Sequence, residues 1–271
     1  HAKHVFIEKP IADTLPDGLA IARLQDAHGV HVALGHCARL LAGNRLMRAA
    51  IRRGDLGRVT LIETSFSNAR AARLTPDDWR WYSASAPGGP LSQIAIHQFD
   101  TLRALGGDIR SVAAASARLA PTGAEVEDQW IATVEFASGA LGSVTSSWTS
   151  AGHHSVRASG TAATMYYEID QTLWSRPERL HEHATLYHQS VDAGPAERIP
   201  IAVPEANMFR DELEGFAEAI RGGAACELSA ANACQALAAV NSALVSARRG
   251  GARVPLEEVL ATARHDLETQ T

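Results

Sequence analysis

The sequence predicts an α/β part at its start and an α+β part after it, on the basis of two observations. Residues 5–34 alternate a short apolar run, a helical pattern and a second apolar run, which is typical of a βαβ unit with parallel strands. Between residues 109 and 169 several strand patterns follow one another without a helix, which indicates a large, mainly antiparallel open sheet. We expect helices to flank that sheet, with a first domain over 1–36 and a second over 37–271.

The opening βαβ unit is defined by the residues that end each run. The apolar run 5–7 ends at Glu8-Lys9-Pro10, a helix capped by Thr14 ends at Gly29, and the run 30–34 follows as the second strand. Ligands of such sheets bind at the carboxyl ends of the strands. The residues of the Glu8-Lys9-Pro10 motif are therefore candidate binding residues.

Periodicity places most of the remaining elements. The run 59–66 is expected to begin a new sheet, whereas the mixed polar segment 176–200 gives no secure strand assignment. Helices are expected up to Gly54, over 208–221 before Gly222-Gly223, and from Ser229 to Gly250. Further strands are expected over 109–119, 129–136, 141–148, 156–159 and 165–169.

The composition limits the classes of partner. The net charge of -5, without a run of like charges, gives no basic surface for nucleic acid or for a membrane. Cys37, Cys226 and Cys234 form no C-x-x-C motif, which favours free thiols in a reducing compartment, and no apolar run reaches the roughly 18 residues of a membrane helix. We expect a cytoplasmic protein with a small-molecule substrate and with neither a nucleic-acid nor a membrane partner.

The helical pattern that begins at Leu91 and stops at Gly106-Gly107 carries the polar residues that we expect to do chemistry. Gln93, His97 and Asp100 follow the spacing of one helix face and should form one polar patch. Imidazole titrates near neutral pH, which makes His97 a candidate general base. A histidine with only a structural role is the competing interpretation.

One group of residues suggests a metal site. His181-Glu182-His183 is followed by His188, but two histidines at i and i+2 share a face only on a strand. No firm carboxylate or cysteine partner completes a ligand set. We therefore predict no metal site.

Three motifs carry a family resemblance. They are the run from His4 to Pro10, the turn Gly54-Asp55-Leu56-Gly57 before a strand, and the Gly-Gly loop that leads into the helix of His97. In this order and spacing they resemble the Gfo/Idh/MocA family of NAD(P)-dependent oxidoreductases, from His4 to about Val254. The resemblance implies NAD or NADP as cofactor and hydride transfer at a secondary alcohol of a sugar, polyol or cyclic diol.

The resemblance also implies catalytic roles. Lys9 would reach toward the reacting carbon and hold the hydroxyl oxygen, and His97 would act as the base. Gln93 stands where the family usually has Asp one helical turn before the His. An amide can orient an imidazole or contact a substrate, but it cannot stabilise the charged imidazolium as a carboxylate would.

Contacts to the cofactor are implied for four residues. Glu8, Lys9 and Pro10 end the fifth strand of the family's Rossmann domain, and the Lys9-Pro10 bond is expected to be cis. Arg39 matches a family position near the nicotinamide and the substrate. An ion pair between Arg39 and a local carboxylate is the competing interpretation.

An aromatic cluster, Trp79-Arg80-Trp81-Tyr82, precedes the loop at Pro87. Beside a catalytic helix such rings could wall a sugar pocket, which makes Trp79 a candidate substrate contact. Core packing is the competing interpretation of these rings.

The sequence contains no G-x-G turn, which the family places before the Glu-Lys-Pro motif. We therefore expect the chain to be the C-terminal remnant of a Rossmann domain followed by the sheet domain, and to bind nucleotide poorly without a preceding part. A non-catalytic binding or oligomerisation module derived from the same family is the alternative. In either case we expect a homo-oligomer formed through the open sheet face.

Overall fold

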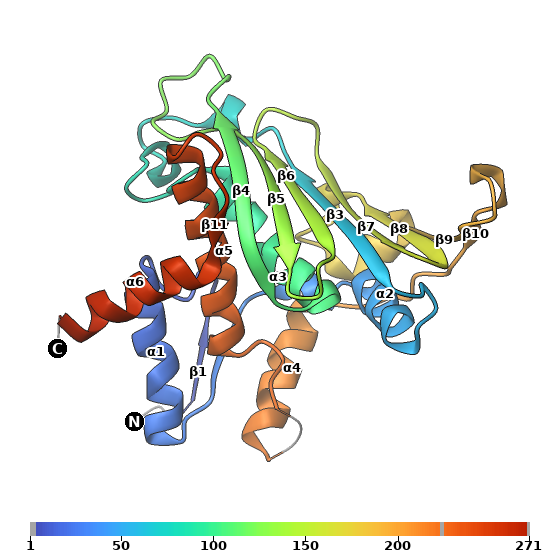
Figure 1. Ribbon diagram of the computed structural model, residues 1–271, viewed down its shortest axis with the longest axis horizontal. Helices are drawn as coiled ribbons and strands as arrows, with labels where there is room; N and C mark the ends of the chain where they lie inside the picture. Colours follow the sequence, from blue (N-terminus) through green and yellow to red (C-terminus); the bar gives the residue numbers. More distant parts are fainter. Residues whose placement is uncertain (1–3, 223–224, 270–271) are drawn as a thin grey trace.

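The computed structural model describes residues 4–222 and 225–269 and has a large sheet with helices on one face (Figure 1). The strands are β1 Val5–Ile7, β2 Val32–Leu34, β3 Val59–Ser67, β4 Ile109–Ala117, β5 Gln129–Phe136, β6 Leu141–Ser147, β7 His153–Gly160, β8 Ala163–Ile169, β9 Thr185–Ser190, β10 Ile199–Pro200 and β11 Val254–Pro255. The α-helices are α1 Leu15–His28, α2 Ala42–Arg53, α3 Ile96–Gly106, α4 Met208–Ile220, α5 Ala230–Arg248 and α6 Leu256–Thr269.

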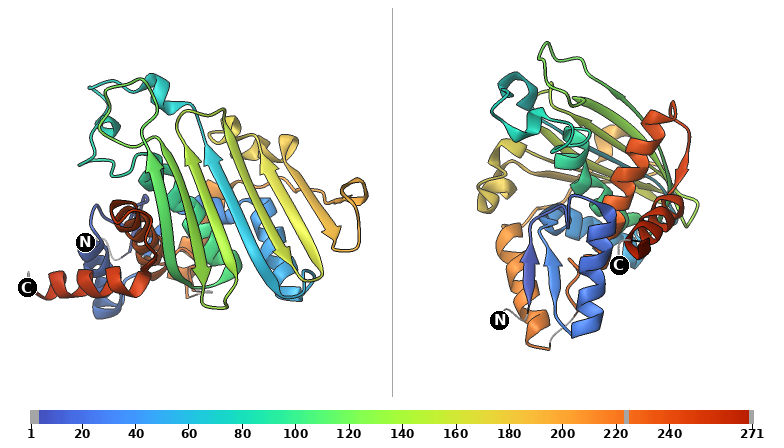
Figure 2. Two further views of the ribbon diagram at one scale, coloured as in Figure 1. Left: turned by 45° about the horizontal axis from the view of Figure 1, so that its top comes forward. Right: turned by 90° about the vertical axis from the view of Figure 1, so that its left-hand side faces the viewer.

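The expected βαβ unit is present. Strands β1 and β2 pair in parallel, and α1 connects them. The hydroxyl of Thr14 caps α1 by accepting a hydrogen bond from the amide of Asp17, and Gly29 ends it with a φ of 60°. Figure 2 shows the two strands between α1 and α4.

The first 36 residues pack against the end of the chain. The amide of Leu34 donates to the carbonyl of Leu228, and α1 packs on both α5 and α6. One hydrophobic core includes Leu15 of α1 and Leu237 of α5. The boundary between residues 36 and 37 stays a prediction.

The large sheet is mainly antiparallel, as expected. Its order is β10-β9-β8-β7-β3-β6-β5-β4-β11, and only β3 and β6 pair in parallel among these neighbours. This exception arises because β3 enters before the β4-β5-β6 meander and is inserted between β6 and β7. Gly139, at a φ of 83°, forms the turn between β5 and β6.

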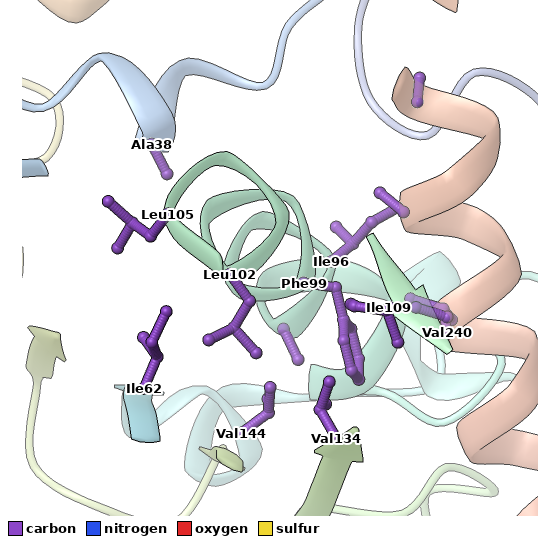
Figure 3. Packing of buried hydrophobic residues seen from close by; sticks show 14 of the residues in the cluster. Ala38, Ile62, Ile96, Phe99, Leu102, Leu105, Ile109, Val134, Val144 and Val240 are labelled. Carbon is purple, nitrogen blue, oxygen red and sulfur yellow. The ribbon is translucent and has the colours of Figure 1, made fainter. Parts of the chain in front are cut away.

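Helix α3 packs on one face of this sheet and α5 lies beside it. Phe99 and Leu102 of α3 are fully buried and point toward Ile62, Val134 and Val144 of the sheet (Figure 3). Burying a side chain of this size contributes about 1.5–3 kcal/mol. The apolar stripe predicted for this helix therefore anchors the whole polar site above the sheet.

The opposite face of the sheet carries no helix in the described part of the chain, and Figure 2 shows it open. Ile131 and Leu141 on this face are 55% and 53% exposed. None of the helices described is long and apolar enough to cross a membrane. Cys37, Cys226 and Cys234 are free, as expected.

Several boundaries differ from the prediction. The segment 176–200 contains a 3-10 helix at Pro177–His183, then β9 and β10, which pair with each other and extend the sheet. Helix α6 was not predicted, although its buried residues Leu256, Leu260, Ala263 and Leu267 have helical spacing. Helix α4 ends at Ile220 before Gly222, whereas the predicted Gly223 lies outside the described residues.

Candidate active site

Two basic side chains lie at the sheet edge where β1 and β2 end. Lys9 follows β1 and His36 follows β2, and parallel strands bring their carboxyl ends together. The ammonium of Lys9 donates a hydrogen bond to the main-chain carbonyl of Gln93 at 2.6 Å. This bond joins the βαβ unit to the segment that carries His97. The Lys9-Pro10 peptide bond is cis, as expected.

The segment before α3 is not the α-helix that the sequence predicted. Leu91–Ala95 forms a π-helical turn, which is wider than an α turn and often lies at functional sites. Gly88 and Gly89 precede it with positive φ values of 71° and 51°. A Cβ on Gly89 would lie 2.3 Å from the carbonyl oxygen of Glu127, so no larger residue fits there. The Gly-Gly pair thus sets where the π turn begins.

His97 lies in a buried cluster of rings. Its side chain is 6% exposed, and its ring centroid is 5.9 Å from that of His36 and 5.9 Å from that of Trp174. Nδ1 of His97 and both ring nitrogens of His36 are buried without a hydrogen-bond partner among the described residues. Such groups are costly to bury and are rarely left unpaired. They mark the place where a ligand would supply the missing partners.

The expected polar patch of Gln93, His97 and Asp100 is divided. A π turn takes more residues per revolution than an α turn, so Gln93 no longer stands directly one turn below His97. No hydrogen bond joins the Gln93 amide to the unpartnered Nδ1 of His97 within residues 4–222 and 225–269. An orienting role of the Gln93 amide toward the imidazole stays a prediction, and so does its expected contact with substrate.

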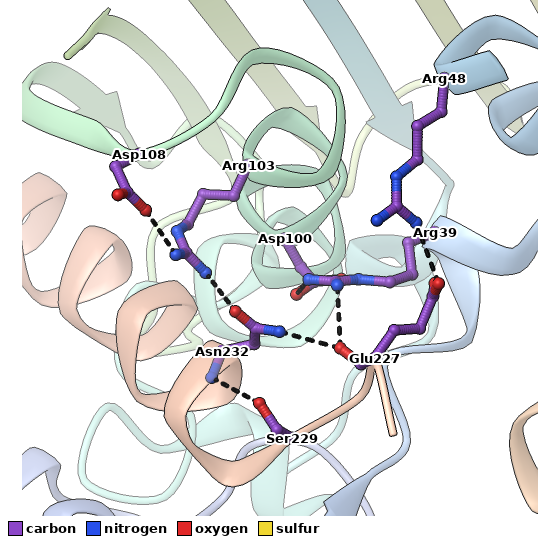
Figure 4. Close-up of polar contacts among 8 residues, drawn as sticks. All are labelled: Arg39, Arg48, Asp100, Arg103, Asp108, Glu227, Ser229 and Asn232. Carbon is purple, nitrogen blue, oxygen red and sulfur yellow. Dashed lines mark hydrogen bonds and ion pairs between the residues drawn. The ribbon is translucent and has the colours of Figure 1, made fainter. Parts of the chain in front are cut away.

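Arg39 forms a buried ion pair with Asp100 (Figure 4). A pair with a local carboxylate is the interpretation that competed with a cofactor contact. The guanidinium Nε donates to Asp100 Oδ2 at 2.6 Å, a second nitrogen donates to Oδ1, and a third donates to the carbonyl of Glu227 at 3.0 Å. Burial alone would raise the pKa of Asp100, but Arg39 and His36 outweigh it and the pKa is lowered. The expected cofactor contact of Arg39 stays a prediction.

The electrostatics of the site keep His97 neutral. Burial lowers the pKa of His97 well below its usual 6.5, and the charges of Lys9, His36 and His154 act in the same direction. Burial also lowers the pKa of Lys9 to about 8. At neutral pH the site therefore holds a neutral imidazole beside a mostly charged ammonium.

The outer wall of the site consists of rings that the sequence did not indicate. Trp174 packs on Phe66 and His154, with ring centroids 5.0 Å and 6.0 Å apart. Trp174 and His154 lie far from His97 in sequence and outside any motif, so only the folded sheet brings them together. His36 could have been predicted as a site residue, because it follows the second strand of the βαβ unit at the carboxyl end where ligands bind.

Trp79 lies at the surface. Its side chain is 46% exposed, and the guanidinium of Arg80 stacks on its ring at 4.2 Å. The core-packing interpretation is therefore wrong for Trp79. The predicted role of Trp79 at the substrate stays a prediction, whereas Trp174 is the tryptophan found against His97.

The carboxylate of Glu8 lies close to Gly35, whose amide donates a hydrogen bond to the carbonyl of Ile7 in β1. A Cβ on Gly35 would lie 2.8 Å from Glu8 Oε2, so glycine leaves room for this carboxylate. Burial raises the pKa of Glu212 on α4 to about 8, and the charge of Glu8 acts in the same direction. Glu8 and Pro10 remain predicted cofactor contacts.

The histidines considered as metal ligands do not lie on a single strand. His181 and His183 belong to the 3-10 helix Pro177–His183, and His188 lies on β9. Within residues 4–222 and 225–269 no three His, Cys, Asp or Glu side chains are grouped as metal ligands would be.

Comparisons with known proteins agree with this architecture. Residues 44–166 match the family model of the GFO/IDH/MocA C-terminal domain. The chain is 35% identical over 142 residues to 1,5-anhydro-D-fructose reductase of Ensifer adhaerens, a match that covers 51% of this chain and 41% of that protein. The chain spans less than half the length of the curated relatives that it matches.

Two crystal structures share the fold over nearly the whole chain. A candidate NADPH-dependent oxidoreductase of Desulfitobacterium hafniense dcb-2 matches with a TM-score of 0.88 and 30% identity, covering 94% of this chain and 74% of the other. An aldose-aldose oxidoreductase of Caulobacter crescentus, complexed with glycerol, matches with a TM-score of 0.78 and 26% identity, covering 93% and 72%. Together with the matched C-terminal domain, the 30% identity to the first of these structures, which this chain covers to 74%, shows that the chain belongs to the Gfo/Idh/MocA family.

Proposed function

We propose that this chain forms the substrate side of an NAD(P)-dependent oxidoreductase that acts on a secondary alcohol of a sugar, polyol or cyclic diol. The observation that carries the proposal is the partly buried Lys9 ammonium at the sheet edge together with a buried, neutral His97 with an unpartnered Nδ1. The names of the relatives support the class of reaction, since they include a reductase of an anhydro sugar and an oxidoreductase of aldoses.

The residues at the carboxyl edge of β1 and β2 fit a nicotinamide nucleotide. His36 and His97 present buried ring nitrogens that lack partners, and Lys9 presents a charge that burial disfavours. Glu8, Lys9 and Pro10 would hold the nicotinamide end at this edge, and Arg39 would contribute from η1 (Cys37–Leu40). When bound, NAD or NADP supplies the acceptor or donor of the hydride.

The two catalytic residues have complementary tasks. A neutral His97 can accept the proton of the substrate hydroxyl, which a protonated imidazole could not do. The Lys9 ammonium can donate a hydrogen bond to the same oxygen and stabilise the negative charge that develops on it. The main-chain carbonyl of Gln93 fixes the ammonium in place, so this task does not depend on the side chain of Gln93.

The product of the complete reading frame that encodes this chain is the material for the test. It should reduce NAD or NADP in the presence of at least one neutral or acidic aldose, polyol or cyclic diol, measured by the absorbance of the reduced nicotinamide. Lys9→Met should abolish most of this activity, whereas Arg52→Met, an exposed change on α2, should not. Absence of activity across such a panel, with nucleotide binding intact, would refute the proposed reaction.

The alternative, a non-catalytic oligomerisation module, has one observation in its favour. The face of the large sheet opposite α3 exposes Ile131 and Leu141. We propose that this face forms the contact between copies of the chain in a homo-oligomer. The two proposals are compatible, because the exposed face lies on the other side of the sheet from His97.

A further inference from the structure

A hollow of about 700 Å³ is lined in part by Trp174. Its walls come from the end of β3, from the short 3-10 helices η2 (Arg70–Arg73) and η5 (Gln171–Leu173), and from the loop before β7. The hollow adjoins the candidate active site, because Trp174 lines it and also packs on His97. Its polar lining residues include Asn68, Arg70, Arg73, Asp78, Gln171 and Thr172.

The hollow carries an excess of positive charge. Arg70 and Arg73 are three residues apart on a 3-10 helix, so their side chains leave the same face. Neither guanidinium forms an ion pair with a described carboxylate. Asp78 is the acidic residue in the lining, and it pairs with Arg80 at 3.5 Å. Arg70 lies over the Trp148 ring at 5.9 Å and is attracted by the charge of Asp78, but neither Arg70 nor Arg73 has a carboxylate of its own among the described residues.

The positive charge extends to the reacting groups. Burial lowers the pKa of Arg70, and Arg80 and Arg73 act in the same direction, which places these guanidinia near one another. Arg80 and Arg70 also lower the pKa of Lys9, so their charges reach the sheet edge. Keeping like charges together costs free energy, which an anionic ligand would relieve.

We propose that Arg70 and Arg73 bind an oxyanion of the substrate, so that the enzyme acts on an acidic sugar whose carboxylate lies in the hollow. This inference rests on the proposed function and narrows its substrate class. The planar guanidinium of arginine binds carboxylates by two parallel hydrogen bonds. Asn68, Gln171 and Thr172 add amide and hydroxyl groups suited to sugar hydroxyls, and Trp174 offers an apolar ring face.

A phosphate ester would present the same oxyanion chemistry, so the test has separate arms. The product of the complete reading frame is titrated in a calorimeter with D-glucuronate, D-glucose 6-phosphate and D-glucose, each with and without the nicotinamide nucleotide. We expect D-glucuronate to bind at least tenfold more tightly than D-glucose, with an affinity that falls as salt is raised. Tighter binding of D-glucose 6-phosphate than of D-glucuronate would show that the hollow binds a phosphate ester and would overturn the carboxylate. Equal affinity for all three sugars would overturn the anion site itself.

Matched variants separate binding from folding. Arg70→Gln and Arg73→Gln should each weaken binding of the acidic sugar about tenfold or more and leave the affinity for D-glucose unchanged. Arg52→Gln removes an equal charge from the exposed face of α2 and should change neither. All three arginines are exposed, so thermal unfolding should stay the same. Unchanged binding of the acidic sugar in the double variant would overturn the assignment.

The outcome distinguishes this inference from the proposed function. Oxidation of acidic sugars that is insensitive to Arg70→Gln but lost in Lys9→Met would uphold the oxidoreductase and refute the anion site. Tight binding of acidic sugars without any nucleotide reduction would uphold the anion site and refute the reaction.

Discussion

At the scale of single residues, burial decides the chemistry of the site. Lys9 and His97 both lie in surroundings that disfavour their charged forms, and after burial the charge of Lys9 further lowers the pKa of His97. Burial of a cation lowers its pKa because water no longer solvates the charge. The result is a neutral base next to a cation with a pKa of about 8, which is the pairing that removal of a hydroxyl proton requires.

The pH dependence of alcohol oxidation follows from these two groups. His97 must be neutral, so kcat/KM should fall only well below pH 6.5, as the pH drops through its lowered pKa. Lys9 must be charged, so kcat/KM should fall again as the pH rises through about 8. Steady-state rates between pH 5 and 10 would check this profile. In Lys9→Arg, which keeps its charge, the alkaline limb should move up or disappear; an unmoved limb would show that Lys9 does not cause it.

At the scale of elements, two features hold the segment of His97 in place. Arg39 of η1 and Asp100 of α3 form a buried, bidentate ion pair, and both side chains are almost completely inaccessible. Removing one partner of such a pair leaves an uncompensated buried charge. The second feature is the Gly-Gly turn that allows the π turn to begin at Leu91.

Asp100→Asn should destabilise the fold by roughly 3–5 kcal/mol, because Arg39 would remain charged and buried. The lowered pKa of Asp100 means that the pair stabilises the fold above the usual carboxyl pKa and loses this contribution as the pH falls through the lowered value. Urea unfolding at pH 7 measures the effect. The apolar double variant Arg39→Met with Asp100→Leu should recover much of the loss; no recovery would argue against an uncompensated charge as the cause.

Gly89→Ala tests the turn before the π segment. The φ of 51° and the 2.3 Å approach to the Glu127 carbonyl leave no room for a methyl group, so we expect a loss of at least about 1–3 kcal/mol together with reduced activity. Gly215→Ala, inside α4 with no atom near its Cβ position, is the control and should be neutral or stabilising by up to about 1 kcal/mol. Equal stability of the two variants would show that the turn tolerates a side chain.

At the scale of the whole molecule, one sheet separates two functions. The face under α3 supports the candidate active site, and the opposite face is open. Exposed Ile131 and Leu141 lie on neighbouring strands, β5 and β6, of that open face. An uncovered sheet face that exposes large apolar side chains can bury them against a second copy of the chain.

We therefore expect the protein to be an oligomer at tens of micromolar in light-scattering measurements. Ile131→Glu with Leu141→Glu should shift it to monomers, because two charges would be buried at the contact. Changing the exposed Leu119 to Glu is the control and should leave the oligomer intact, since Leu119 lies outside the strands. A wild-type protein that is monomeric at these concentrations would contradict the proposed role of the open face.

Local patterns predicted much of this fold. The βαβ unit, the antiparallel meander and the positions of Lys9 and His97 followed from apolar periodicity and from the residues that end each element. The π turn could not be predicted, because the apolar spacing of Leu91–Ala95 also fits an α-helix and the close approach of Gly89 to Glu127 is a tertiary contact. Trp174 and His154 were missed for the same reason, since tertiary packing alone brings them to His97.

The most direct test of the central claim compares His97→Asn with Gln93→Ala in the product of the complete reading frame. We predict that His97→Asn lowers kcat by about 10²–10⁴, the loss typical of a missing general base. Gln93→Ala should cost much less, since Lys9 is bound by the main-chain carbonyl at that position and not by the amide. Wild-type kcat in His97→Asn, with unfolding unchanged, would contradict the assignment of His97 as the base.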